Sequence, residues 1–387
     1  MRILHLSDLH VGKKINDISL LEDQIHVFRQ ALNIVNEKNI DLVIIAGDIF
    51  DKAIVSSDSL RMYSTFTEKL IFDYNVNIIA ISGNHDSGSR LDYESLMKEK
   101  VGYYVFGEFK GYVEKITLED QYGKIDFYPI PYIEPMRARA IYEDPSIRTY
   151  DEVYERIMED IHIDGSRRNI CIAHGFVTSH RVDNSEELKE KIDDRDKYQI
   201  INMVAGLEQV SEKHFSKFDY TALGHIHRSY PVDEDKTIGY CGSLIKTNFN
   251  EENQIKTFLI VDIDDKNISF EKIPVDLLRD MRVINGKLSE ILEREDFDTS
   301  SIKVILEDSE PIPNAMDKLR IIFPNILQLN YSNLVSEINE FNKDLESMTF
   351  EEVINEFFAF KTGKSLNEKQ VGVVKKVVER LGGGDED

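Results

Sequence analysis

The sequence predicts a mixed α/β protein with two packed β-sheets flanked by helices, a small β/α domain and a helix-loop-helix at the carboxyl end. Three observations support this fold class. Short apolar strands alternate with helical patterns as far as residue 82, which predicts parallel strands joined by helices. Pairs of antiparallel strands follow after residue 90. The chain has 387 residues, too many for one small core, so we expect a large domain with smaller additions.

The first 82 residues follow a strand, helix, strand, helix, strand pattern. Apolar strands are predicted at 2–7, 42–46 and 78–82, and helices with apolar residues at helical spacing at about 20–38 and 60–70. Right-handed crossover connections would place the carboxyl ends of all three strands at the same edge of one sheet. Ligands bind at that edge in open α/β sheets.

The segment after residue 90 changes to antiparallel pairing. We expect one hairpin from 112–118 and 124–128, and another from 257–262 and 268–273. The segment 176–212 is polar and dense in charge, and we expect an irregular, mobile excursion there. The remaining elements predicted in this part are the helix 150–161 and the strands 169–173, 220–223 and 240–243.

The sequence divides into three predicted domains, 1–274, 275–331 and 332–387. Pro274 and the polar pair Arg279 and Asp280 mark the first boundary. The elements predicted for the small second domain are the strands 281–285, 302–306 and 326–329 and the helices 288–294 and 315–323.

The third domain ends in two short amphipathic helices. Each begins with a capping box, one at 349–352 and one at 365–368, in which a hydroxyl and a glutamate satisfy unpaired amides at the helix start. A polar connection, 332–348, precedes them, and the glycine-rich, acidic segment 382–387 follows and is predicted to be disordered.

The overall charge and the cysteine content limit the possible functions. A formal charge of −24, from 71 acidic and 47 basic residues, argues against a nucleic-acid binder, although bound cations or a basic partner could offset it locally. Cys171 and Cys241 lie in apolar strands without zinc-knuckle spacing, so we expect buried, reduced thiols and a cytoplasmic protein. The chain begins directly with a strand, and no apolar run reaches membrane-spanning length, so we expect no signal peptide and no membrane association.

Polar side chains follow five of the predicted strands at their carboxyl ends. They are carboxylates, one amide and imidazoles, which suit divalent ions such as Mn²⁺, Fe²⁺ or Zn²⁺, and no thiolate is among them. So many ligands exceed one tetrahedral site but suit two ions that share a carboxylate, and Asp48 is the natural bridge because it lies centrally in the set. The residues at these strand ends are Asp8, His10, Asp48, Asp51, Asn84, His85, His174, His225 and His227.

Each of these motifs alone could be an ordinary turn or helix cap. For all of the motifs taken together, this explanation is weak, because half of the ten histidines would have to lie after apolar strands and beside glycines by chance. We interpret the other five as core or surface residues: His5, His26, His162, His180 and His214.

The motifs resemble those of calcineurin-like metallophosphoesterases in both residue type and order. They are Asp8-x-His10, Gly47-Asp48-x-x-Asp51, Gly83-Asn84-His85-Asp86, Ala173-His174-Gly175 and Gly224-His225-x-His227. Within that superfamily, the sequence Gly-Asp-Ile-Phe-Asp at 47–51, the segment 278–282 and the small domain resemble the bacterial SbcD nuclease subunits, counterparts of the Mre-eleven DNA-repair nuclease.

This resemblance implies the metallophosphoesterase fold and a role for each site residue. One metal would be bound by Asp8, His10, Asp48 and His227, and the other by Asp48, Asn84, His174 and His225. His85 would contact the scissile phosphate and protonate the leaving oxygen. Asp86 would orient its neighbours without binding metal, and Asp51 would be either such an outer residue or a turn residue rather than a ligand.

The resemblance also implies the reaction and the partners. The family hydrolyses DNA phosphodiesters, as an exonuclease on duplex ends and an endonuclease on single strands or hairpins, with Mn²⁺ favoured. It works as a homodimer, for which the 60–70 helix is a candidate contact, with an SbcC-type coiled-coil ATPase. The small domain would cap the site and contact DNA. The terminal helices would dock on the ATPase as helix-in-groove anchors through Val353, Ile354, Phe357, Phe358, Val374 and Val378.

Two other functions compete with the nuclease. The same site chemistry could serve a phosphomonoesterase or a small-molecule phosphodiesterase. Serine/threonine phosphatases of this superfamily, however, have Arg-Gly after the second aspartate of the Gly-Asp motif, whereas Lys52 and Ala53 follow Asp51 here. A non-catalytic scaffold protein is the third possibility, and the complete set of motifs argues against it.

Overall fold

The computed structural model describes residues 1–16, 18–179, 208–233, 235, 237–265, 267–294, 299–332, 366 and 370–372. The chain forms two compact units. The first comprises Met1–Val283 with Asp298–Lys303, and the second comprises Ile284–Phe297 with Val304–Asp387. Within the described residues, no helix combines the length and the apolar character needed to cross a bilayer.

One sheet of the first unit is built mainly from the predicted parallel strands. Its described strands are β1 (Arg2–Leu6), β4 (Leu42–Ala46), β5 (Asn77–Ile81), β6 (Tyr103–Phe106), β15 (Thr257–Ile263) and β16 (Ile268–Pro274). Their order is β16-β15-β1-β4-β5-β6. The pairs β1 with β4 and β4 with β5 are parallel, as the crossover argument predicts, and β15 extends the sheet antiparallel to β1.

A second sheet contains the later strands. Its described strands are β7 (Ile116–Asp120), β8 (Gly123–Ile130), β9 (Arg168–His174), β12 (Tyr220–Gly224), β13 (Tyr230–Pro231) and β14 (Ile238–Tyr240). Their order is β13-β14-β12-β9-β8-β7. The predicted first hairpin is the antiparallel pair β7 and β8, and β9 runs parallel to both β8 and β12.

The two sheets pack face to face around an apolar core. Ile44 and Ile79 of the first sheet and Phe127, Ile170 and Ala222 of the second belong to one fully buried cluster. These strands are apolar on consecutive residues because both of their faces are covered. The predicted pair of packed sheets is therefore confirmed. Cys171 and Cys241 are buried and free, as predicted.

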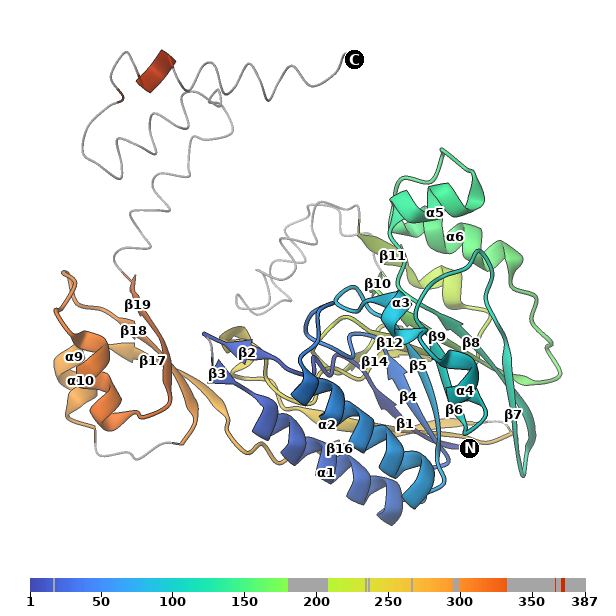
Figure 1. The fold of residues 1–387 in the computed structure, drawn as a ribbon, viewed down its shortest axis with the longest axis horizontal. Coiled ribbons are helices and arrows are strands. Elements are labelled where there is room, and N and C mark those ends of the chain that lie inside the picture. The colour runs from blue at the N-terminus through green and yellow to red at the C-terminus, as the bar shows by residue number, and fades with distance from the viewer. Residues whose placement is uncertain are drawn as a thin grey trace. The chain divides into compact units, whose positions relative to one another are not determined.

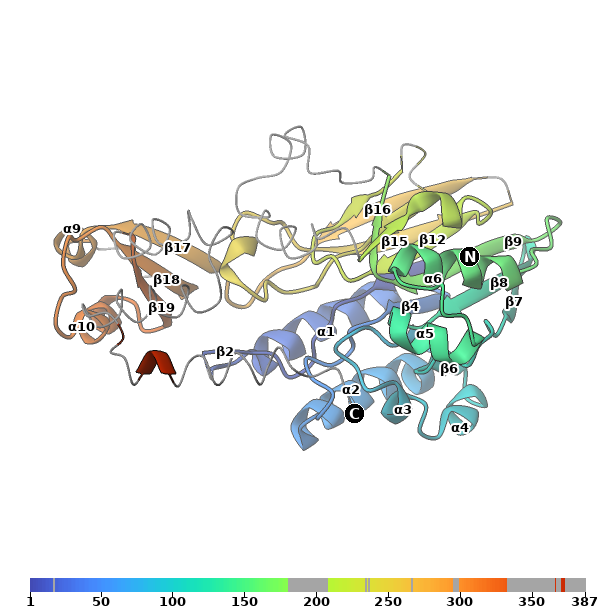
Figure 2. The same cartoon turned by 90° about the horizontal axis from the view of Figure 1, so that it is seen from above.

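Helices cover the outer faces of both sheets (Figures 1 and 2). On the first sheet, α1 (Leu21–Glu37) and α2 (Ser57–Glu68) lie side by side, and the rings of Phe28 and Phe66 stack between them with centroids 4.4 Å apart. A π-helical turn, Lys69–Asp73, continues α2. On the second sheet, a separate apolar cluster joins α5 (Pro135–Tyr142) and α6 (Tyr150–Asp160) to β8 and β9.

Several local predictions need correction. The segment 176–212 is not irregular throughout, because its ends form the parallel strands β10 (Phe176–Thr178) and β11 (Gln209–Ser211). Residues 180–207 lie outside the described part. The predicted strand 240–243 is shorter and earlier, as β14. Elements that the periodicity did not predict are β2 (Lys14–Ile15), β3 (Ile18–Ser19), α3 (Gly88–Leu91), α4 (Ser95–Glu99), β6, α5, β13 and the short turns Glu212–Phe215 and Phe249–Glu251.

The second unit is built around a three-stranded sheet with the order β17-β18-β19 among the described residues. Its elements match the predicted ones closely: β17 (Met281–Gly286), α9 (Leu288–Leu292), β18 (Ser301–Leu306), α10 (Ala315–Ile322) and β19 (Ile326–Tyr331). The predicted anchors of the tail lie outside the described residues.

Candidate metal centre

The predicted site residues meet at the carboxyl edge of both sheets of the first unit. They lie in the loops after β1, β4, β5 and β12 and, for His174, at the last position of β9. Four of them have left-handed backbone angles that side chains rarely adopt, with φ of 50° at Asp8, 42° at His10, 50° at Asp48 and 104° at His225. Strained backbone of this kind is typical of functional sites, where the surrounding fold holds it in place.

Asp48 lies at the centre of the group. Its Oδ2 is 3.7 Å from His10 Nε2 and 3.5 Å from His174 Nε2, while its Oδ1 accepts the backbone N–H of His85 at 2.9 Å. One oxygen of the carboxylate, Oδ2, is therefore close to two imidazoles that come from different loops.

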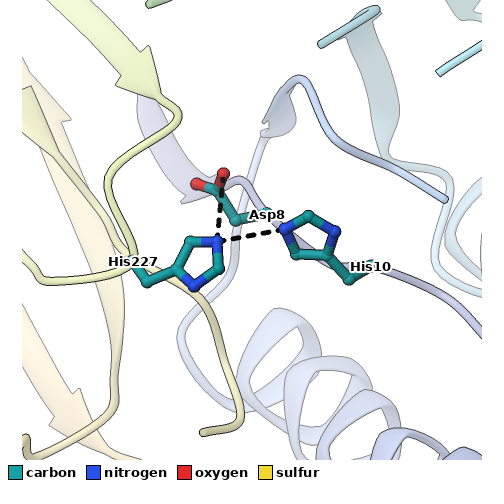
Figure 3. Close-up of side chains that lie close together, drawn as sticks. All are labelled: Asp8, His10 and His227. Atoms are coloured by element: carbon teal, nitrogen blue, oxygen red, sulfur yellow. Dashed lines mark hydrogen bonds and ion pairs between the residues drawn. The ribbon is translucent and has the colours of Figure 1, made fainter. Parts of the chain in front are cut away.

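The first subsite is formed by Asp8, His10 and His227, whose ligand atoms converge (Figure 3). The Nε2 atoms of His10 and His227 are 3.1 Å apart, and His227 Nε2 is 4.0 Å from Asp8 Oδ1. Nitrogen and oxygen ligands bound to one ion at about 2.0–2.2 Å lie roughly 3–3.5 Å from one another, so the spacing of the two imidazoles fits a divalent ion, while Asp8 lies slightly farther away.

The second subsite joins loops from both sheets. Asn84 Oδ1 is 3.1 Å from His174 Nε2 and 3.1 Å from His225 Nδ1. Asp8, Asp48 and His174 also form a group whose ligand atoms all lie within 4.8 Å of one another. The donor set of carboxylate, amide and imidazole suits a divalent ion here as well.

Hydrogen bonds set the orientation of two of the imidazoles. His174 Nδ1 donates to the carbonyl oxygen of Ala46 at 2.8 Å, which leaves its Nε2 with the lone pair that faces Asn84 and Asp48. His227 Nδ1 faces Glu251 Oε1 at 3.1 Å, which leaves its Nε2 facing His10. In both rings the outer nitrogen is occupied and the inner one is available as a ligand.

The electrostatics differ among the histidines. Burial lowers the pKa of His10 and of His225 to about 3, so both are neutral imidazoles able to donate a lone pair. Burial also acts to lower the pKa of His174, but the charge of Asp48 and the hydrogen bond to it raise that pKa to about 9, so a metal ion that binds at Nε2 would displace a proton from it. Burial would raise the pKa of Asp48, yet the surrounding histidines, above all His174, hold it well below its usual range.

His85 lies at the exposed rim of the site. Its ring centroid is 4.8 Å from that of His10, in an edge-on arrangement. Its Nδ1 donates to the carbonyl oxygen of Asp51 at 2.9 Å, which fixes the ring and leaves Nε2 free. A free imidazole nitrogen beside the ligand cluster can exchange a proton with a bound substrate.

Asp86 ties two of the site loops together. Its carboxylate accepts the backbone N–H groups of Ile49 at 3.0 Å, Phe50 at 2.9 Å and Gly83 at 2.9 Å. Burial and the nearby charge of Asp48 raise the pKa of Asp86 to about 6 despite these bonds. It connects the loop that carries Asp48 to the loop that carries Asn84 and His85.

Asp51 lies closer to the cluster than a simple turn residue would. Its Oδ1 pairs with Lys13 Nζ at 2.8 Å and lies 3.9 Å from His10 Nδ1. Asp51, His10 and His85 form a third group of converging ligand atoms.

Gly83 allows a close approach between two loops. A Cβ atom added there would overlap the backbone nitrogen and the carboxylate of Asp48. A glycine is needed at this position for lack of space rather than for backbone conformation, because Gly83 is not among the residues with positive φ.

Sequence reasoning missed a buried group behind His227. Glu251, Thr247 and Lys256 form hydrogen bonds and an ion pair around its Nδ1 and backbone. These residues carry no motif and no distinctive spacing, and the strand predictions passed over the 249–251 turn. The only signal in the sequence is that each of these three positions has a polar or charged residue.

Comparisons with known proteins extend over the whole chain. Residues 1–229 match the family of calcineurin-like phosphoesterases, and residues 277–362 match a domain described as the type 5 capsule protein repressor C-terminal domain. The chain is 28% identical over 392 aligned positions to the SbcD subunit of the nuclease SbcCD of Staphylococcus saprophyticus, covering 98% of each chain.

Solved structures with similar chains have much lower identity. One is GAP50 of Plasmodium, the anchor in the inner membrane complex, with a TM-score of 0.38, 11% identity and coverage of 85% of this chain and 96% of that chain. Another is a dimetal phosphatase from Danio rerio, with a TM-score of 0.38, 10% identity and coverage of 70% and 95%.

Proposed function

Because the chain belongs to the calcineurin-like phosphoesterase family, we propose that it is a metal-dependent nuclease that hydrolyses DNA phosphodiester bonds. The observation that carries the proposal is the convergence of the motif side chains around Asp48, whose Oδ2 lies near one histidine of each proposed subsite. The similarity to a nuclease subunit along the whole chain supports DNA as the substrate.

Two divalent ions, with Mn²⁺ as the preferred ion, would occupy the two subsites. Asp48 is the proposed bridge between them. Asp8, His10 and His227 would be the other ligands of one ion, and Asn84, His174 and His225 would be the other ligands of the second. Ions at such sites activate water and stabilise the negative charge of the phosphate during displacement.

The protein's own groups position and protonate the substrate. His85 is the proposed general acid, since its Nδ1 is held by the Asp51 carbonyl and its free Nε2 can carry the proton that the leaving sugar oxygen takes. Asp86 and Gly83 keep the loop that carries His85 packed against the loop that carries Asp48, so that the proposed acid stays close to the proposed metal ligands.

We propose the same substrate range as the family resemblance implies: exonuclease action on duplex ends and endonuclease action on single strands or hairpins. The small domain, 275–331, is the proposed cap that contacts DNA. The net charge of −24 makes the bound cations important, because they offset the repulsion between the site and the phosphate backbone.

The proposed partner is an SbcC-type ATPase in the cytoplasm, where free buried cysteines such as Cys171 and Cys241 stay reduced. The terminal helices are the proposed docking segment. Truncation after Met348 should leave basal nuclease activity intact and abolish co-purification with the ATPase. Retained co-purification would refute this assignment.

We also propose a homodimer that forms through α2 and its neighbours. Leu60 of α2 and Leu96 and Met97 of α4 are 51%, 76% and 69% exposed, so these apolar side chains are accessible to a second copy of the chain. Light scattering should give the mass of a dimer for the wild type and of a monomer for Leu60→Glu combined with Leu96→Glu. A wild-type monomer at micromolar concentration would contradict the proposal.

The nuclease assignment is tested by degradation of linear duplex DNA with Mn²⁺. The wild type should degrade it, and His85→Ser should abolish cleavage while the protein still binds metal. If the wild type hydrolysed only p-nitrophenyl phosphate esters and left DNA intact, the phosphomonoesterase alternative would replace the nuclease.

A further inference from the structure

A buried carboxylate stands directly behind one of the candidate metal ligands. Glu251 is 1% exposed and ends the short turn Phe249–Glu251. Its Oε1 lies 3.1 Å from His227 Nδ1 and accepts hydrogen bonds from Thr247 Oγ1 at 2.7 Å and Asn248 Nδ2 at 2.6 Å. Three groups thus hold one carboxylate oxygen in place at the rear of the imidazole.

A buried lysine holds the other oxygen. Lys256 is 4% exposed, and its Nζ lies 2.5 Å from Glu251 Oε2. The same ammonium donates to the backbone oxygen of His227 at 2.9 Å and to Ser243 Oγ at 2.9 Å. Lys256 therefore binds both the residue behind the imidazole and the backbone that carries the imidazole. A charge this deeply buried requires such a partner.

The turn that carries Glu251 is also held from its other side. Lys246 Nζ donates to the backbone oxygen of Glu252 at 2.6 Å and pairs with Asp280 Oδ1 at 2.5 Å. The N–H of Val283 donates to Glu252 Oε1 at 2.8 Å. Glu251 is thus fixed relative to His227 by contacts that do not involve the imidazole itself.

We infer that Glu251 is a positioning residue for His227: it accepts the Nδ1 proton and so directs the Nε2 lone pair toward His10 and Asp8. The inference rests on the proposed metal-dependent function, because it assigns Glu251 to the shell around one of the two ions. Partners of this kind typically change metal affinity by about 10–100-fold.

The test must separate positioning from simple burial of an ion pair. Two double variants do so, Glu251→Leu with Lys256→Met and Glu251→Gln with Lys256→Met. Both remove the buried charge pair at similar volume, so neither leaves an unpaired charge. Only the glutamine keeps a carbonyl oxygen that can accept the His227 proton.

The readout is Mn²⁺ binding to the full-length protein, measured without DNA by calorimetry and by the electron paramagnetic resonance signal of free Mn²⁺. The leucine variant should lose about 10–100-fold in affinity for one of two ions, and the glutamine variant less than tenfold. Asp126→Asn is the matched control, because Asp126 is a fully buried carboxylate paired with Lys115 and Arg167 away from the site. It should destabilise the fold and leave both affinities unchanged.

A milder variant keeps the test decisive if the leucine variant fails to fold. Thr247→Val removes the hydroxyl that donates to Glu251 Oε1 and lies 3.0 Å from His227 Nδ1, and it should weaken binding of the same ion several-fold. Unchanged affinity for both ions in every folded variant would overturn the inference. A wild type that binds two Mn²⁺ ions but does not cut DNA would refute the proposed substrate alone. A wild type that binds no Mn²⁺ would refute both.

Discussion

Replacing Asp86 with alanine should loosen the metal centre without removing any ligand. The carboxylate accepts three backbone N–H groups, from Ile49, Phe50 and Gly83, at 2.9–3.0 Å. A backbone N–H that loses its charged acceptor lowers the free energy of unfolding by about 1–3 kcal/mol. We take about 1 kcal/mol for each of the three N–H groups, because Asp86 is partly exposed and water can take the place of its carboxylate in part. We expect a loss of about 3 kcal/mol in the free energy of unfolding.

The same change should weaken metal binding, because the two loops that Asp86 connects carry Asp48 on one side and Asn84 on the other. We expect about 10–100-fold lower affinity for Mn²⁺. At about 2–4 °C per kcal/mol, the melting temperature should fall by roughly 6–12 °C. Calorimetric titration with Mn²⁺ and thermal unfolding in the presence of a chelator measure the two effects separately.

Asp92→Ala is a matched control for this prediction. Asp92 also clamps a loop through its carboxylate, accepting the N–H groups of Gly107 at 2.6 Å and Glu108 at 3.1 Å, but it contacts no candidate ligand. It should lower stability by about 2 kcal/mol and leave Mn²⁺ affinity unchanged. The reasoning fails if Asp86→Ala binds Mn²⁺ like the wild type, or if Asp92→Ala loses as much affinity.

Three further changes test other parts of the structure. Gly83→Ala should reduce DNA cleavage by about 100-fold, because its Cβ would displace Asp48, and a wild-type rate in a cleavage assay would contradict this. Phe127→Ala should cost about 3–5 kcal/mol in urea unfolding, since this ring is fully buried between the sheets, while a loss below about 1 kcal/mol would show that the core refills the space. Chelation should abolish cleavage and lower the melting temperature. Adding Mn²⁺ at about 100 times its dissociation constant should restore about 2.7 kcal/mol of the free energy of unfolding per site. A melting temperature that does not change with Mn²⁺ would argue against a folded metal site.

The sequence by itself determined the main strands of the first unit and which residues follow them as candidate ligands. Strands such as 42–46 are apolar on every residue because both faces are covered, and this pattern is visible locally. The candidate ligands can also be recognised from the local sequence, because each directly follows a predicted strand. Parallel pairing of β1, β4 and β5 then requires their ends to meet. Short elements such as β6 and α5 were missed because tertiary packing, rather than periodicity, stabilises them.

Only the tertiary structure decided how these residues act on one another. The 3.1 Å approach of His10 to His227 joins residues 217 positions apart, and no local pattern encodes such a distance. No local pattern encodes the contact between Glu251 and His227 either, or the hydrogen bonds from three backbone amides to Asp86. Hydrogen-bond geometry depends on how two sheets and their loops pack, whereas the sequence specifies directly only what each residue can donate or accept.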